Sequence, residues 1–455
     1  MNFSKAKKKY TTARLYIEDY NHYTGELWLD FINANEFCYF NSMGDSDSIE
    51  QILDRYIPSM IYVRGIGKDA GLRHGSVLEV PMDRLSEFRS ISKQRYKEEQ
   101  RHEEERRYEE ERYEVERRYE KQRYEEERMY EEERYEEEQR LPADVNMTVG
   151  GEAFLNLLNS ESTKRIDYLS DFVYDDLYIA IGRLLNRYWE GPPCNLDKLK
   201  KSFDVKIWDV GQGNTNSISD GTNLTLFDIG CSKHFNKQEQ QKIWNNHLNY
   251  VNAHDRPTLI ISHWDVDHFN MLSCADDEFI KNLCCAFVPT ICNTVMAKQL
   301  LYKLTKSCKY VRLIEPMRRD EPRHNHLHEI YKGTHFTMYT GECSTSKNNS
   351  GLALHVFGQN VSVFLTADHS NSQICDDMYN HYITNHELNI VVPHHGARCG
   401  VFGIPNSCNN KSAIISVGKN SYKHPLQEVI DNYTAAGFEV LRTDWERKDI
   451  DIKVH

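Results

Sequence analysis

The segment Ser262–His268, which reads Ser-His-Trp-Asp-Val-Asp-His, constrains this chain more than any other part of it. It follows directly on the apolar run Leu259–Ile261, so four side chains that can bind a metal lie just beyond an expected strand. Two imidazoles and two carboxylates make a poor hydrophobic core, but they suit one or two divalent ions. Such ions lower the pKa of a bound water toward neutrality. The segment therefore indicates a hydrolytic metal site at the end of a β-strand.

The composition indicates a globular protein interrupted by one unusual segment. At 455 residues, two or three domains are expected. The apolar fraction is only 39% because residues 93–140 are almost entirely Glu, Arg, Tyr and Gln, and the net charge is -13. This acidity does not favour a nucleic-acid partner, so such a contact would need a local basic patch. The 12 cysteines form no CxxC pair, which is typical of a reduced, cytoplasmic protein, and we expect no contact with a membrane.

Residues 93–140 contain an 11-residue repeat rich in Tyr, Glu and Arg, with close copies beginning at Arg107, Arg118 and Met129. This period is close to that of an α-helix, and Glu/Arg pairs three apart and Tyr/Arg pairs four apart stabilise a helix that stands alone. We therefore predict a long spacer helix. The Tyr residues fall on two faces rather than on one seam, which leaves two alternatives: a helix that forms a homo-oligomer, or a disordered segment.

The segments on either side of this repeat carry no chemical motif. Residues 1–92 alternate in hydrophobicity in several places, which predicts a small mixed α/β module of unknown role. Residues 141–202 begin with Leu141-Pro142, which ends the helix, and we predict a helical adaptor with helices near 152–158 and 169–189. A protein partner bound through residues 1–202 is an open alternative.

From residue 203 to residue 455, strands alternate with helices, and metal-binding residue types repeatedly follow the strand ends. Expected strands at 224–227, 362–366 and 388–392 are followed by Asp228, Asp368 and His394, respectively. In layered α/β folds, sites are built at such strand ends.

Several motifs of this half occur in a characteristic order. They are Asp209-Val-Gly-Gln-Gly213, Phe227-Asp228-Ile229-Gly230, Ser262-His263-x-Asp265-x-Asp267-His268, Thr366-Ala367-Asp368, Val392-Pro-His394-His395-Gly396 and Ser416-Val-Gly-Lys-Asn420 with Tyr422, His424 and Pro425. Together they resemble the metallo-β-lactamase superfamily, and most closely the soluble nuclease-like domain of the competence protein ComEC. The resemblance covers residues 203–455 and implies an α/β fold in which two sheets lie between helices, an αββα sandwich.

The resemblance also implies a site for two divalent ions, Zn²⁺ or Mn²⁺, with Mg²⁺ as a further alternative. The residues it assigns as ligands are His263, Asp265, Asp267, His268, Asp368 and His394. Asp368 would bridge the two ions, and Asp228 would support the ligand loop from behind. Asp267 and His424 would take part in catalysis, and Asn420 and Tyr422 would bind substrate. The role of His395 is left open.

This chain departs from the motif pattern in ways that bear on its chemistry. Asn214 stands where the family has Asp after Gly-Gln-Gly, and Ala367 stands where it has Gly. Asp265 replaces the second His that is commoner in the superfamily, as in the ComEC branch. A site richer in oxygen suits harder ions and argues against β-lactam hydrolysis.

A long insertion between Phe269 and Asn348 carries a second group of histidines, His324, His326 and His328, and many positive side chains. Those positive residues are Lys298, Lys303, Lys306, Lys309, Arg312, Arg318 and Arg319. A basic surface of this kind can hold a polyanion through phosphate contacts. The equally weighted alternative is that these side chains are simply solvated and bind no ligand.

These features lead to three functional hypotheses. The first is a metal-dependent nuclease, acting on DNA by preference, in which two ions bind the scissile phosphate and activate the attacking water. The second is a hydrolase of small phosphodiesters or nucleotides on the same fold, because fold alone does not select a substrate. The third is an assembly component whose hydrolase domain is active only in a complex, for example in bacterial defence against phage.

Overall fold

The structure is a computed structural model. It describes residues 11–21, 24–37, 61–64, 66, 72–73, 75–85, 147–150, 164–166, 194–317, 326–343, 348–378, 386–400, 410–418, 420, 423–446 and 448–455. The predicted spacer helix at 93–140 and Tyr422 lie outside these residues. No helix among the described residues combines the length and apolar character needed to cross a membrane.

Residues 194–455 are built around two seven-stranded sheets. The first sheet has the order β12-β11-β10-β9-β8-β7-β20, and the second has the order β13-β14-β15-β16-β17-β18-β19. The strands of the first sheet are β7 (Phe203–Ile207), β8 (Asn216–Ser219), β9 (Leu224–Phe227), β10 (Thr258–Ile260), β11 (Cys285–Pro289), β12 (Val311–Ile314) and β20 (Ile450–Val454). Those of the second are β13 (Leu327–Lys332), β14 (Phe336–Gly341), β15 (Leu352–Phe357), β16 (Val361–Leu365), β17 (Glu387–Val391), β18 (Lys411–Ile415) and β19 (Glu439–Arg442).

Helices and short helical turns connect these strands. The α-helices are α6 (Lys237–Asn252), α7 (Val266–Phe269), α8 (Asp277–Asn282), α9 (Val295–Ser307), α10 (Asn371–Gln373), α11 (Gln427–Ala435) and α12 (Thr443–Glu446). The short turns are η1 (Asn195–Lys198), η2 (Asn270–Ser273), η3 (Asn348–Ser350), η4 (Ile374–Met378) and η6 (Pro393–Gly396). A capping box between Asn236 and Glu239 begins α6, and the Thr294 side chain caps α9, so local sequence sets where both helices start.

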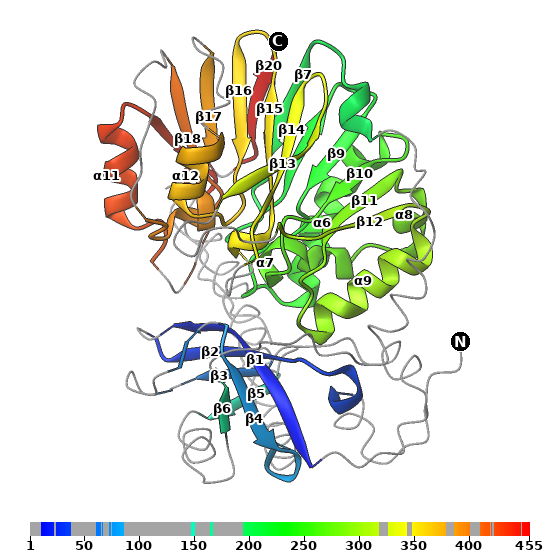
Figure 1. Ribbon diagram of the computed structural model, residues 1–455, viewed down its shortest axis with the longest axis vertical. Helices are drawn as coiled ribbons and strands as arrows, with labels where there is room; N and C mark the ends of the chain where they lie inside the picture. Colours follow the sequence, from blue (N-terminus) through cyan, green and yellow to red (C-terminus); the bar gives the residue numbers. More distant parts are fainter. Residues whose placement is uncertain are drawn as a thin grey trace, which may run out of the picture.

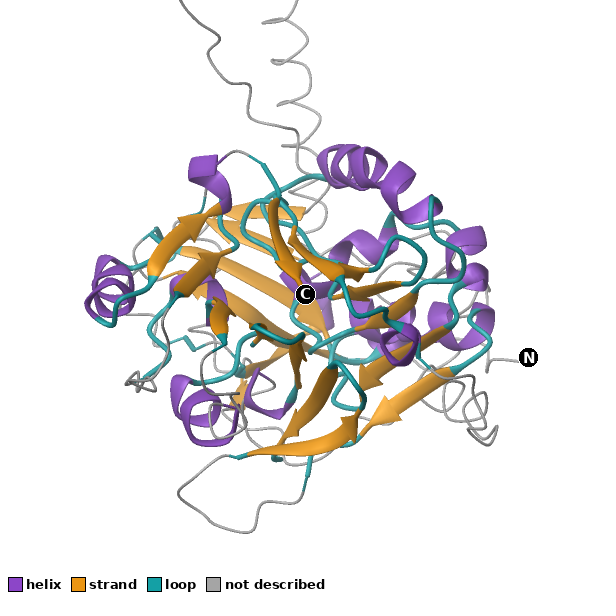
Figure 2. Ribbon diagram, turned by 90° about the horizontal axis from the view of Figure 1, so that it is seen from above, coloured by secondary structure: helices purple, strands orange, loops and turns teal. Residues whose placement is uncertain are grey.

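Three hydrophobic clusters define the layers of this sandwich. Apolar side chains from the inner faces of both sheets, such as Ile260 of β10 and Val363 of β16, pack together in one cluster. A second cluster joins the outer face of the first sheet to α6, α8 and α9, and includes Trp244. A third joins the outer face of the second sheet to α11, and includes Tyr433. The order of layers is therefore the αββα order expected from the sequence, with helices on both flanks of the sheets (Figure 2).

The central strands run parallel to one another, which determines where their ends meet. β9, β10, β11 and β12 pair in parallel in the first sheet, and β16, β17, β18 and β19 do so in the second. Strands β9, β10 and β16 are buried at every position, as expected for parallel strands covered on both faces. The loops that follow parallel strands of one sheet lie at the same edge of that sheet.

A separate six-stranded sheet precedes the sandwich, in the order β5-β3-β2-β1-β4-β6. Its strands are β1 (Thr12–Asn21), β2 (Glu26–Phe31), β3 (Ile61–Arg64), β4 (Val77–Pro81), β5 (Met147–Gly150) and β6 (Lys164–Ile166). The last two strands come from the segment for which the sequence predicts a helical adaptor, and the helices expected at 152–158 and 169–189 lie outside the described residues. The prediction did not foresee these strands because each is short and pairs with a distant partner, β3 or β4.

The N-terminal sheet packs against α9 and the edge of the sandwich that carries α7 (Figure 1). Met296 N of α9 donates to Asp30 Oδ2 at 3.3 Å, and Lys298 Nζ donates to the Ile32 carbonyl at 2.9 Å. Apolar residues of the N-terminal sheet and of the α9 side of the sandwich belong to one continuous cluster. The N-terminal sheet and the sandwich therefore share a core.

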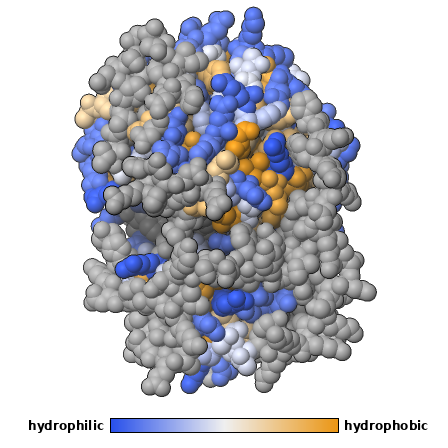
Figure 3. Space-filling model, in the orientation of Figure 1, coloured by the Kyte–Doolittle hydropathy of each residue, from blue (hydrophilic) through white to orange (hydrophobic). Residues whose placement is uncertain are grey.

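This packing corrects part of the prediction of a basic insertion. Lys298 is only 1% exposed, because the N-terminal sheet covers it, and Lys303 donates to the Ala275 carbonyl at 2.7 Å. Lys298 therefore does not belong to an open basic surface, and the Lys303 ammonium group is engaged by that carbonyl. Arg318 and Arg319 lie outside the described residues. On the face shown in Figure 3, hydrophilic residues cover much of the described surface of the sandwich, with an apolar patch to the right of centre.

Candidate metal centre

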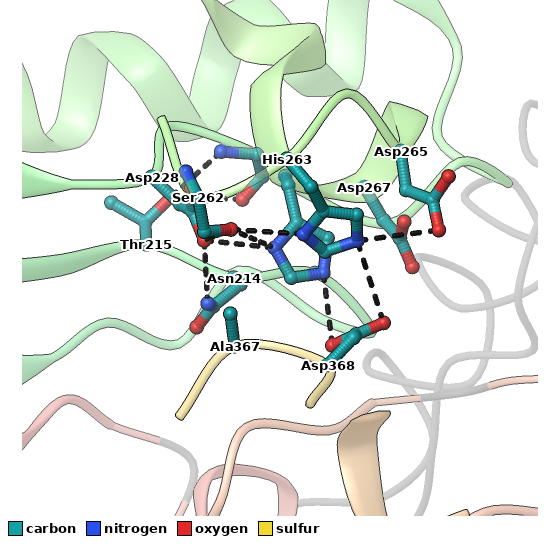
Figure 4. Close-up of polar contacts among 12 residues, drawn as sticks. Asn214, Thr215, Asp228, Ser262, His263, Asp265, Asp267, Ala367 and Asp368 are labelled. Carbon is teal, nitrogen blue, oxygen red and sulfur yellow. Dashed lines mark hydrogen bonds and ion pairs between the residues drawn. The ribbon is translucent and has the colours of Figure 1, made fainter. Parts of the chain in front are cut away.

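The predicted site residues follow five strands whose carboxyl ends lie along one edge of the sandwich. Asp228 follows β9, and the segment Ser262–His268 begins just after β10. Asp368 follows β16, η6 with its two histidines follows β17, and the turn before His424 follows β18. Figure 4 shows the side chains from the first sheet above Asp368 of the second, so the site is shared between the two sheets.

Asp228 is fully buried and organises the ligand segment from behind. Its Oδ1 accepts a hydrogen bond from Ser262 N at 2.6 Å, and its Oδ2 accepts from Ser262 Oγ at 2.7 Å and from Asn214 Nδ2 at 2.8 Å. His268 Nδ1 also lies 2.8 Å from Asp228 Oδ2. Asn214, one of the departures from the motif pattern, thus donates to a buried carboxylate.

These contacts fix the orientation of both histidines in the ligand segment. An ionised carboxylate only accepts, so His268 Nδ1 carries the proton and donates to Asp228. Ser262 Oγ donates to Asp228 and lies 3.0 Å from His263 Nδ1, so it is placed to accept from that nitrogen. In both imidazoles, Nε2 is therefore directed away from Asp228. His263 Nε2 lies 3.3 Å from Asp265 Oδ2, and these side chains surround a common space in Figure 4.

Asp368 faces three histidines from the second sheet's side of the site. Its Oδ1 lies 3.2 Å from His268 Nε2, and its Oδ2 lies 3.7 Å from His263 Nε2 and 2.5 Å from His394 Nδ1. The preceding residue, Ala367, has a φ of 48°, a conformation that favours the family's glycine. The structure thus brings Asp368 between the two histidines of the ligand segment, the position expected of a bridging carboxylate.

His395, whose role the sequence left open, lies next to Asp267. Its Nδ1 is 2.8 Å from the Ser416 carbonyl oxygen, which only accepts, so Nδ1 carries the proton. Its Nε2 lies 3.4 Å from Asp267 Oδ2, and the side chain is only 6% exposed. His394 differs, because its side chain is 38% exposed and its Nδ1 contacts Asp368. Both histidines have a positive φ, 53° for His394 and 54° for His395. This backbone conformation lets the side chains of two consecutive residues reach the same site.

Two groups of side chains among the described residues have the geometry of metal ligands. His263, His268 and Asp368 form one, and Asp267, His268 and His395 form the other, with the ligand atoms of each group within 4.8 Å of one another. The buried Nε2 atoms of His268 and His395 make no hydrogen bond, although each lies 3.2–3.4 Å from a carboxylate oxygen. In the neutral tautomers, the Nε2 lone pair faces a carboxylate, and either a second proton on the imidazole or a bound cation relieves this opposition. The residues present therefore fit divalent ions.

The pKa values of these groups reflect the same opposition of charges. Burial disfavours the imidazolium form of His268, but Asp368 and Asp228 outweigh it and raise its pKa well above the usual value. Burial would raise the pKa of Asp368, but His394 and His268 hold it well below its usual range. The pKa of Asp267 is likewise lowered against the effect of burial, by His395 and His268. The carboxylates are therefore ionised at neutral pH.

His424 lies beside His394, and Asn420 belongs to the same turn as His424. The His424 ring centroid is 6.3 Å from that of His394, and burial lowers the pKa of His424 to about 3, aided by the charges of His394 and His395. Asn420 Nδ2 donates to the carbonyls of Gly418 and His424, and its Oδ1 accepts from His424 N. The Asn420 side chain is thus engaged with the backbone and positions the turn that carries His424.

Several residues that shape the site were not identified from the sequence. A Cβ at Gly230 would lie 2.0 Å from the Asp267 carbonyl oxygen, and one at Gly351 would lie 2.6 Å from the Ser262 carbonyl oxygen. Both glycines let the backbone of a neighbouring loop approach the ligand segment. Ser262 orients two imidazoles, and Asn348 Nδ2 lies 3.3 Å from His394 Nδ1. Ser262 and Gly230 both stand in the ordered motifs, and this was the signal by which the sequence could have identified them.

The histidines of the insertion do not join this centre. His326 Nδ1 lies 3.2 Å from Asp377 Oδ1, and His328 Nε2 lies 3.0 Å from Glu342 Oε1. His324 lies outside the described residues. Each described histidine of this group thus faces its own carboxylate.

No family model and no curated protein matches this chain. Among solved structures, it is similar to the metallo-β-lactamase fold protein YhfI from Bacillus subtilis, with 11% identity and a TM-score of 0.33 over 56% of this chain and 100% of that one. It is also similar to a diphosphatase from the PhnP family, with 9% identity and a TM-score of 0.30 over 55% of this chain and 97% of that one.

Proposed function

We propose that the chain is a metal-dependent hydrolase that cleaves phosphodiesters, with nucleic acid, and DNA in particular, as its substrate. One observation carries the proposal. The Nε2 atoms of His268 and His395 are buried without a hydrogen bond and face carboxylate oxygens, while their Nδ1 atoms are held by Asp228 and by the Ser416 carbonyl. Imidazoles oriented in this way, with the other nitrogen bound to an oxygen acceptor, are typical metal ligands.

The proposed ligands fall into two sets, and the Asp368 carboxylate belongs to both. One ion would be held by His263, Asp265 and Asp368. The other would be held by Asp267, His268 and His395, together with Asp368. This assignment replaces His394 of the sequence-based prediction by His395. Divalent ions at such a site supply Lewis acidity and lower the pKa of a bound water. Three imidazoles and three carboxylates suit Mn²⁺ as well as Zn²⁺.

The remaining residues of the site have roles that follow from their charge. The carboxylate of Asp368 raises the pKa of His394 against the effect of burial, so this exposed imidazole is available as a cation for a phosphate oxygen. His424, with its lowered pKa, stays neutral and can donate to or accept from a substrate oxygen. Asn420 positions His424 through the backbone, and Tyr422 stays a predicted substrate-binding residue.

The choice of a polynucleotide over a small phosphodiester rests on the resemblance of the ordered motifs to the nuclease-like domain of ComEC. A cytoplasmic location, a protein partner bound through residues 1–202, oligomerisation through 93–140 and a role in defence against phage stay predictions from the sequence.

Cleavage of nucleic acid by the full-length chain, loaded with Mn²⁺ or Zn²⁺, tests this proposal. We expect plasmid and single-stranded DNA to be cut, and Asp267→Ala to lower the rate by more than about 100-fold, since even substitutions behind metal ligands cost 10–100-fold. Asp255→Ala, at an exposed carboxylate on the α6–β10 connection, is the matched control and should cut normally. Cleavage of bis(p-nitrophenyl) phosphate without cleavage of nucleic acid would restrict the substrate to small phosphodiesters. An absence of both activities would refute the proposal.

A further inference from the structure

Strand β19 brings the helix that follows it, α12, to the edge of the sandwich that carries the metal centre. β19 pairs in parallel with β18, and Arg442 at its end lies opposite Ile415 at the end of β18. β18 pairs in parallel with β17, and β17 with β16. The carboxyl ends of these four strands therefore lie along one edge, where Asp368 and His395 follow β16 and β17. α12 begins directly after β19 and so begins at this edge.

The first residue of α12, Thr443, is tied to the backbone next to a proposed metal ligand. Thr443 is fully buried, and its Oγ1 accepts from Val417 N at 3.0 Å and donates to the Val417 carbonyl at 2.9 Å. The preceding carbonyl, that of Ser416, lies 2.8 Å from His395 Nδ1. Neighbouring strands are about 4.8 Å apart, so α12 begins about 10 Å from the end of β17 and about 15 Å from that of β16.

Trp445 of α12 exposes its ring at this edge. Its exposed fraction is 61%, and Met317 is the only other exposed large hydrophobic side chain in the part of the chain that the structure describes. The remaining described tryptophans are at most 2% exposed: Trp28, Trp208, Trp244 and Trp264. Single exposed apolar side chains are common, so exposure alone assigns no role to Trp445. Its neighbours and its place at the edge do.

Arg442 covers one face of the Trp445 ring. Its guanidinium carbon lies over the ring, 4.2 Å from the centroid. The same guanidinium is held by Asp444, with Nε donating to Oδ1 at 2.9 Å and Nη2 donating to Oδ2 at 2.6 Å. A two-point pair of this kind fixes the plane of the guanidinium. Since one face of the indole is covered, its large exposed area belongs to the opposite face and the ring edge.

The charges around this ring are balanced. Asp444 pairs with Arg442, and Glu446 lies 3.8 Å from Lys448 Nζ. These pairs provide no net positive charge to attract a phosphate, so the ring itself is the binding feature. An open aromatic face next to a cation suits a nucleobase, which stacks on such rings whatever its sequence. A separation of about 10–15 Å from the metal centre corresponds to about three to four stacked nucleotides of one strand.

We propose that Trp445 stacks on a base of a single-stranded nucleic acid, about three to four nucleotides from the phosphate at the metal centre. Trp445 is a substrate-binding residue in this account, and Arg442 is a positioning residue that holds the ring. The inference rests on the proposed function for the place of the scissile phosphate. It deepens that function by naming single strands as the substrate class, because a small phosphodiester does not span the distance from the metal centre to the ring.

Binding of an oligonucleotide of about 12 nucleotides to the metal-free, full-length chain tests the stacking without cleavage. We expect the oligonucleotide to quench tryptophan fluorescence. Trp445→Ala should abolish most of this quenching and raise the Kd measured by anisotropy about tenfold, as expected for one lost stacked base. Trp445→Phe should restore most of the affinity. Glu439→Ala, at the exposed opposite end of β19, is the matched control and should bind normally.

Kinetics on the metal-loaded chain separate this role from catalysis. Trp445→Ala should raise KM for the single-stranded oligonucleotide about tenfold and leave kcat and metal content unchanged. Hydrolysis of bis(p-nitrophenyl) phosphate should not change, because this compound is too short to reach the ring. Arg442→Met should reproduce part of the KM increase and add little to Trp445→Ala, because both changes act on one contact. Additive effects in a folded double variant would overturn the role of Arg442.

The outcomes also separate this inference from the proposed function. If the oligonucleotide binds through Trp445 but no phosphodiester is cut, Trp445 is a base-binding residue and the proposed hydrolysis is wrong. A chain that cuts bis(p-nitrophenyl) phosphate but binds no single strand is a hydrolase in which this inference fails. Unchanged Kd and KM in Trp445→Ala, or an equal rise in KM for bis(p-nitrophenyl) phosphate, would likewise overturn the stacking role.

Discussion

At the scale of single residues, the site depends on side chains that act through others. Asp228 accepts hydrogen bonds from Ser262, Asn214 and the proposed ligand His268, and it acts on the site through them. Its effect is to hold a proton on His268 Nδ1, which leaves Nε2 directed at Asp368. The Ser416 carbonyl does the same for His395. The site therefore has two imidazoles whose rings are oriented through Nδ1 by neighbouring oxygen atoms.

We predict that Asp228→Asn weakens metal binding by about 10–100-fold, because an amide has one acceptor oxygen where the carboxylate has two, and both accept from groups of the ligand segment. Metal affinity measured by competition with a chelator checks this. Asp204→Asn, at an exposed position of β7, is the control and should bind metal normally. Equal affinities in the two variants would show that Asp228 does not orient His268.

At the scale of elements, the strand ends could be predicted from the sequence, and the loops that approach them could not. The run Leu259–Ile261 and the polar residues that follow it are local signals, and β9, β16 and β17 lie within one residue of where they were expected. The choice between His394 and His395 depends on two positive φ angles and on a carbonyl at Ser416, 21 residues away. No local pattern carries that information.

We predict that Gly230→Ala lowers metal affinity and activity more than it lowers stability. The added Cβ would meet the Asp267 carbonyl oxygen at 2.0 Å, so the ligand segment must shift. Gly221→Ala is the comparison, because its added Cβ meets nothing within 4 Å although its φ of 81° is strained. Metal content and thermal unfolding of both variants check this. Normal metal content in Gly230→Ala would mean that the loop yields instead of the ligand segment.

At the scale of the whole molecule, the N-terminal sheet and the sandwich share one hydrophobic cluster. The sequence separates residues 1–92 from 203–455 by a long charged segment, which favours the picture of a tethered module. Lys298 shows why that picture is incomplete, since the sequence presents it as a surface lysine and the N-terminal sheet buries it. Contacts between segments more than 200 residues apart leave no local pattern in either one.

We predict that the buried contact between Asp30 and α9 makes stability depend on pH. Burial, together with the charge of Glu18, raises the pKa of Asp30 from 3.8 to about 7. Between about pH 4 and pH 7, the folded chain retains a proton that the unfolded chain has released, so the free energy of unfolding falls as pH rises through this range.

Asp30→Asn should remove this component, which amounts to a few kcal/mol at most. Its unfolding free energy should therefore change less than that of the unaltered chain between about pH 5 and about pH 8 in urea titrations. Asp83→Asn, at an exposed position just after β4, is the control. Parallel pH dependences for all three chains would contradict the assignment of Asp30.

The central claim, that these histidines and aspartates form one centre for two metal ions, is tested most directly by the metal content of the purified chain. After equilibration with Mn²⁺ or Zn²⁺ and removal of free ions, we expect about two ions per chain, as in other two-metal hydrolases. His395→Ala should lose about one of them, and Asp368→Ala should lose most of both. A chain that retains no ion, or a His395→Ala variant that retains the full number, would contradict the account.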